Sequence, residues 1–112
     1  IVALRLPLLP ARMAHMRGYL PAKALLLKPI AAVPGDQVCR RHQHIMINNR
    51  LQAIAARGDT SGRRLPVWIG CRVLKRHEIF VLSSMTGSFD SRYFGPLHRK
   101  AVVGVAHPLV TF

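Results

Sequence analysis

The fold is decided by the stretch Leu25-Leu26-Leu27-Lys28-Pro29-Ile30-Ala31-Ala32-Val33-Pro34-Gly35-Asp36. Most of this stretch lies in an apolar run, residues 24–33, that carries a single lysine. A proline inside a helix removes a backbone donor and clashes with the preceding turn, so Pro29 disfavours a helix here. Pro29 also restricts Lys28 to β or polyproline geometry. The stretch therefore predicts an extended segment that carries Lys28 and ends in a Pro-Gly-Asp turn.

The rest of the chain reads as further short extended segments separated by glycine, proline and asparagine. Asn48-Asn49 fits a two-residue hairpin turn, because asparagine tolerates positive φ. Residues 10–18 predict one short helix, with a proline near its start and a glycine at its end. Loops are expected at 58–62 and 85–96, and strands at 1–6, 37–41, 44–47, 50–54, 78–82 and 101–106. With 112 residues, the chain is expected to form one mainly β, antiparallel domain over residues 1–112.

The charge is strongly basic, with 17 lysines and arginines against four acidic residues and a formal net charge of +13. Such a charge suits nucleic acid or an anionic membrane surface. The basic residues, however, are spread as isolated pairs without a helical basic stripe or zinc-finger spacing, so nucleic acid is the less favoured partner. No stretch reaches the roughly 18 apolar residues of a membrane span. The chain begins with isoleucine, and we expect the natural N-terminus to lie upstream.

Lys28 has the local surroundings of a lysine that could act as a base. A lysine must be neutral to accept a proton, and its reference pKa of about 10.4 would have to fall by about 3 units. Desolvation can lower it. Apolar residues flank Lys28 and the nearest acid is Asp36, eight residues on. The alternative is an ordinary solvated lysine.

Ser88-Phe89-Asp90-Ser91-Arg92 forms the second chemical motif. Asp90 and Arg92 can pair through a bidentate guanidinium–carboxylate contact that fixes the shape of a loop. The Ser88 hydroxyl can accept a hydrogen bond from an amine and orient it. The alternative is a polar turn with no role in chemistry.

Together, the lysine stretch and this second motif resemble the signal peptidase family, most closely its conjugative-transfer branch, which matures pilin subunits. The Lys-Pro dipeptide and the intervening Pro66-x-Trp68-x-Gly70-Cys71-Arg72 are similar to that branch. The resemblance implies a signal-peptidase-like β fold, a serine–lysine endopeptidase without a cofactor, and a pilin or secreted-precursor substrate that binds as an added strand. It also implies that Lys28 is the general base, that Ser88 orients its amine, that Asp90 and Arg92 form a supporting ion pair, and that Leu26 and Leu27 line the substrate pocket.

The same resemblance places the domain at the periplasmic face of the inner membrane. Taken alone, Cys39 and Cys71 fit either two buried thiols or one disulfide. An oxidising compartment favours the disulfide.

The nucleophilic serine that the resemblance requires is not evident. The five serines are Ser61, Ser83, Ser84, Ser88 and Ser91, and none precedes Lys28. We expect the nucleophile in an N-terminal piece outside this sequence, and no proteolysis by these residues alone.

Two alternatives remain. His42 and His44 could join Cys39 and Cys71 in a metal site, although the spacing is unlike common zinc motifs. The chain could also be a non-enzymatic basic β module that binds anionic membrane or nucleic acid.

Overall fold

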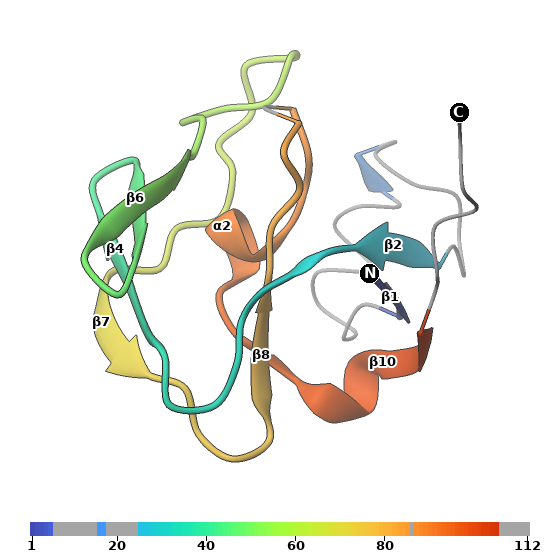
Figure 1. Cartoon of the computed structure of the whole chain (residues 1–112). Helices are drawn as coiled ribbons and strands as arrows, with labels where there is room; N and C mark the ends of the chain where they lie inside the picture. The colour runs from blue at the N-terminus through green and yellow to red at the C-terminus, as the bar shows by residue number, and fades with distance from the viewer. Residues whose placement is uncertain (6–15, 18–24, 86, 106–112) are drawn as a thin grey trace, which may run out of the picture.

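The computed structural model describes residues 1–5, 16–17, 25–85 and 87–105, and there it is mainly antiparallel β, as predicted (Figure 1). The strand orders of its three sheets are β10-β1-β2, β3-β8-β9 and β6-β5-β4-β7. The elements are β1 (Val2–Leu4), β2 (Leu26–Lys28), β3 (Ile30–Ala32), β4 (Gln37–Arg41), β5 (His44–Ile47), β6 (Arg50–Ile54), β7 (Gly70–Val73), β8 (Glu78–Val81), α2 (Ser91–Phe94), β9 (Leu97–His98), the 3-10 turn η1 (Arg99–Ala101) and β10 (Val102–Val105).

The stretch around Lys28 is extended, and it passes from one sheet to another. Residues 26–28 pair with β1 and residues 30–32 pair with β8, with Pro29 at the break between them. The predicted turn follows, where the Asp36 amide donates to the Val33 carbonyl (3.0 Å) and the Asp36 carboxylate accepts from the Val33 amide (2.9 Å). Gly35 has a φ of 95°, a conformation that glycine adopts without strain.

The predicted hairpin is confirmed. Strands β5 and β6 pair in antiparallel register, and Asn48 and Asn49 between them have φ values of 50° and 65°. On the other side of the same sheet, β7 pairs with β4 and sets Cys39 opposite Cys71. The two sulfurs form a disulfide of 2.08 Å.

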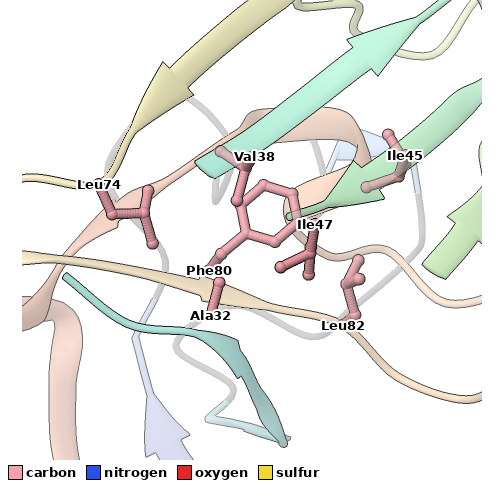
Figure 2. Close-up of a cluster of buried hydrophobic side chains, with 7 residues drawn as sticks. All are labelled: Ala32, Val38, Ile45, Ile47, Leu74, Phe80 and Leu82. Atoms are coloured by element: carbon pink, nitrogen blue, oxygen red, sulfur yellow. The ribbon is translucent and has the colours of Figure 1, made fainter. Parts of the chain in front are cut away.

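Strand β8 lies at the centre because its two faces enter two apolar clusters. Successive side chains of a strand point to opposite faces, so Ile79 and Val81 pack with Val2 and Leu4 of β1, whereas Phe80 packs with strands of the four-stranded sheet. Figure 2 shows the second cluster around the Phe80 ring, made of Ala32, Val38, Ile45, Ile47, Leu74, Phe80 and Leu82. Burial on both faces makes β8 the support for the segments on either side of it.

The structure departs from the sequence prediction in the segment 85–96, which contains α2 instead of a continuous loop. The cause is local: the Asp90 side chain caps the helix by accepting from the Arg92 amide (3.1 Å), and Gly95 ends it at a φ of 75°. The last strand begins at Val102, because residues 99–101 form η1. The predicted helix at 10–18 lies outside the described residues except for Met16 and Arg17. Within the described part of the chain, no helix is both long enough and apolar enough to cross a membrane.

Candidate active site

A cavity of about 410 Å³ brings the two chemical motifs together. Lys28 enters it from the end of β2, and Ser88 enters it from the segment before α2, although the two residues are far apart in the sequence. The remaining wall comes from the same two regions and from the loop after β6. The lining residues are Leu26, Lys28, Ala56, Gly58, Asp59, Thr60, Leu65, Gly87, Ser88, Phe89 and Tyr93.

Lys28 is held in a partly desolvated position at this cavity. Its side chain is buried, with 9% of the residue exposed, and its backbone pairs with Val2 of β1. Burial lowers the pKa of the Lys28 amine, the carboxylate of Asp90 opposes this change, and the guanidinium of Arg92 adds to it. A lysine amine with a lowered pKa is more often neutral at a given pH, and a neutral amine can accept a proton.

Asp90 and Arg92 form a buried, bidentate ion pair next to this site. The Arg92 Nε and Nη2 atoms donate to the two carboxylate oxygens of Asp90 at 2.8 and 3.0 Å. The Asp90 side chain is fully buried and also accepts from the Ser83 amide (2.9 Å). Arg92 Nη2 in turn donates to the Ser83 carbonyl (2.9 Å), so this pair ties the end of β8 to the start of α2.

Ser88 and Ser91 occupy different positions in the same motif. Ser88 is partly buried and lines the cavity. Ser91 is fully buried, and its hydroxyl accepts from the Val81 amide (3.0 Å), which holds α2 against β8. Ser88 therefore lines the cavity, whereas the Ser91 hydroxyl supports the fold.

Leu26 and Leu27 are placed differently relative to the cavity, and their role in substrate binding stays a prediction. Leu26 is in the cavity wall, whereas Leu27 is 62% exposed and lies outside the wall. The reason is the alternation of a strand, which sends residues 26 and 28 to one face and residue 27 to the other.

Aromatic wall residues are what sequence reasoning missed. The Phe89 and Tyr93 rings stack at 5.9 Å, and the Tyr93 hydroxyl accepts from the Ala56 amide (3.0 Å). The spacing of four between these rings, around the Asp-x-Arg motif, was the available signal. Leu65 and Ala56 belong to the loop after β6, and no local sequence pattern indicates that they line the cavity.

The described residues contain no group of three or more histidine, cysteine or acidic side chains placed to hold a metal ion. Cys39 and Cys71, the sulfur ligands of the metal alternative, are bonded to each other. The disulfide removes the thiolates that a zinc site would need.

Comparisons with known proteins show the family of this chain. The sequence profile of the family described as "Signal peptidase, peptidase S26" matches residues 1–110, and the chain belongs to that family. The fold is similar to that of a crystal structure of a signal peptidase I from Enterococcus faecalis V583, at a TM-score of 0.50 and 19% identity over 95% of this chain and 92% of that one.

Two relatives of known name are similar in sequence. A conjugal transfer protein TraF of Agrobacterium tumefaciens (strain 15955) is 33% identical over 106 residues, which are 88% of this chain and 60% of that protein. A plasmid transfer protein TraF of Escherichia coli is 31% identical over 100 residues, 85% of this chain and 56% of that protein. The chain thus spans somewhat more than half the length of the curated relatives it matches.

Proposed function

We propose that this chain is the lysine-bearing part of a serine–lysine endopeptidase of the signal peptidase type. The observation that carries the proposal is the joint placement of a buried lysine of lowered pKa and Ser88 at one cavity. In this proposal the neutral Lys28 amine is the general base, and the Ser88 hydroxyl accepts a hydrogen bond that aims it. The Asp90–Arg92 pair keeps the Ser88 segment in place.

The reaction is acyl transfer. Neutral Lys28 takes the proton of a serine hydroxyl as the serine oxygen attacks the substrate carbonyl, and the protonated amine then returns the proton to the leaving nitrogen. Water releases the acyl group from the serine in the second step. That serine is proposed to come from a segment upstream of Ile1, since all five serines of this sequence follow Lys28.

The substrate is proposed to be a precursor protein of conjugative transfer, such as a pilin. The support is the naming of the relatives, which are conjugal and plasmid transfer proteins. In the described part of the chain, β2 ends the order β10-β1-β2, so one edge of it is available to an extended peptide. A peptide added there would run past Leu26 and Lys28, as in strand-addition binding.

The decisive experiment uses the full-length protein that contains the upstream serine. Lys28→Met should abolish cleavage of the precursor while leaving the circular dichroism spectrum close to that of the parent and the melting temperature no lower. Arg50→Met, at an exposed cation of β6 outside the cavity wall, is the control and should cleave normally. Normal cleavage by Lys28→Met would end the general-base assignment.

We also propose that the domain works at an anionic membrane surface on the periplasmic side. The disulfide supports an oxidising compartment. The turn before β8 contacts the start of η1, where the Arg99 amide donates to the His77 carbonyl (2.7 Å). This contact brings exposed cations of the two segments close together. These cations are Lys75, Arg76, Arg99 and Lys100.

Cosedimentation with vesicles tests this proposal. Binding to vesicles that contain phosphatidylglycerol, weakened by salt and by charge removal at Arg99 and Lys100, would support it. Absence of vesicle binding, or preferential retention on DNA, would refute it.

A further inference from the structure

Arg40 is a buried cation that has no carboxylate partner among the described residues. The residue is 1% exposed, on the inner side of β4. The chain has four acidic side chains, and each is engaged elsewhere. Asp36 contacts Asn48, Asp59 pairs with Arg63, Glu78 with Arg72, and Asp90 with Arg92. Burial of a charge without a counter-ion is costly, so the contacts that Arg40 does make need a reason.

Those contacts are main-chain carbonyls of three separate segments. Arg40 Nε donates to the His42 carbonyl (2.8 Å) after β4, and Nη1 donates to the Arg92 carbonyl (2.8 Å) in α2. Nη1 also lies 3.4 Å from the Pro66 carbonyl, in the segment before β7. A planar guanidinium presents its donors in a rigid fork, so it fixes the relative positions of the groups that it joins.

The helix α2 depends on such outside contacts. A helix of four residues is not stable on its own, and its last carbonyls lack partners inside the helix. Trp68 Nε1 donates to the Ser91 and Arg92 carbonyls, both at 3.1 Å, and Arg40 supplies a second donor to the Arg92 carbonyl. The C-terminal end of α2 is therefore held by Arg40 and Trp68, from β4 and the segment leading into β7. The other end is the Asp90 cap, two residues after Ser88.

We propose that Arg40 is a positioning residue, which holds α2 against the β6-β5-β4-β7 sheet and thereby sets Ser88 and the Asp90–Arg92 pair beside Lys28. Its importance for catalysis rests on the function proposed above, whereas its effect on α2 does not. When the fork is lost, α2 shifts, water reaches the cavity, and the Lys28 amine regains its ordinary protonation behaviour.

The test compares Arg40→Met with Arg41→Met, since Arg41 is the next residue of the same strand and is exposed. The first readout is the titration of the Lys28 side chain, followed by NMR of ¹³C-labelled lysine and assigned with Lys28→Met. The second is hydrogen exchange of the α2 amides of Tyr93 and Gly95, which donate to the Asp90 and Ser91 carbonyls. Lowered global stability by itself leaves the titration midpoint of the folded state unchanged.

In Arg40→Met we expect Lys28 to titrate at a higher pH than in the parent, and the α2 amides to exchange about tenfold faster or more relative to those of β8. Arg41→Met should change neither. If Arg40→Met does not fold, Arg40→Lys is measured instead, because an ammonium keeps the charge but lacks the fork. Where Lys28 of the parent titrates below its ordinary value, an Arg40 variant that folds with an unchanged Lys28 titration overturns the inference, whatever its stability.

The two proposals fail separately. If Lys28 in the parent chain titrates at its ordinary value, the general-base proposal fails, and the exchange of the α2 amides then decides the role of Arg40. Faster exchange confined to α2 in Arg40→Met supports the positioning role, and unchanged exchange refutes it.

Discussion

Replacement of Asp90 by alanine should destabilise this protein more than the loss of any exposed ion pair. Asp90 is fully buried, and its carboxylate accepts four hydrogen bonds: from the Ser83 amide, the Arg92 amide, and the Nε and Nη2 atoms of Arg92. Asp90→Ala leaves the Arg92 guanidinium buried without its counter-ion. Breaking a buried pair from one side costs about 3–5 kcal/mol, because the remaining charge stays desolvated.

The half-exposed pair between Arg63 and Asp59 provides the comparison. The Arg63 side chain is 44% exposed and that of Asp59 is 6% exposed, so Arg63→Ala leaves the remaining charge closer to water than Asp90→Ala does and should cost less stability. Urea denaturation followed by tryptophan fluorescence suits the assay, since Trp68 donates to carbonyls of α2. Asp90→Asn keeps the shape of the side chain but not its charge, so its loss of unfolding free energy should fall between those of Asp90→Ala and Arg63→Ala. A loss for Asp90→Ala no larger than that for Arg63→Ala would refute the claim that this ion pair holds the loop and α2 together.

Three further predictions concern charge and covalent links. Burial lowers the pKa of Lys28 from 10.5, so the unfolded chain keeps this proton at pH values where the folded chain has lost it. Lys28→Met should therefore be more stable than the parent near neutral pH, and this gap in unfolding free energy should narrow as the pH rises toward 10.5; a gap that widens contradicts the assignment. Reduction of the Cys39–Cys71 disulfide, which spans a sequence separation of 32, should cost about 3–4 kcal/mol in calorimetry or chemical denaturation, and no change would show that the bridge does not restrict the unfolded chain. Hydrogen bonds from Val33 and Asn48 lower the pKa of Asp36 below 3.8, so its stabilising contribution is present above that pH and is lost as the pH falls through the folded-state pKa. Asp36→Asn should accordingly lose less stability than the parent on acidification below about pH 4. The same dependence of unfolding free energy on pH in both proteins would contradict a stabilising role for the Asp36 carboxylate in this turn.

Local sequence patterns were enough to predict much of the β structure. The hairpin around Asn48 and Asn49 and the turn at Gly35 follow from residues that accept positive φ, and the break at Pro29 follows from its ring. The helix α2 was missed, because four residues carry too weak a periodic signal. Its cap residue Asp90 and its terminating Gly95 were nonetheless visible in the sequence.

Within the site, the spacing of Asp90 and Arg92 permitted an ion pair, and the structure contains it. Alternation along β2 separates Leu27 from Leu26 and Lys28, so the strand pattern places only Leu26 on the face of the lysine. Arg40 could not have been recognised, because nothing in residues 37–41 distinguishes a buried arginine from the exposed Arg41 beside it.

The amino-acid order by itself determined where the backbone is extended and where it turns. It also placed a lysine in an apolar run, which is expected to become buried when the chain folds. Those properties depend on neighbours within a few residues, through backbone sterics and hydrophobicity. Only the tertiary structure decided that Lys28 and Ser88 share one cavity, that Cys39 meets Cys71, and that Arg40 reaches the carbonyl of Arg92. Each of these contacts joins segments that are distant in the sequence, and strand pairing together with the packing of the two apolar clusters brings those segments together.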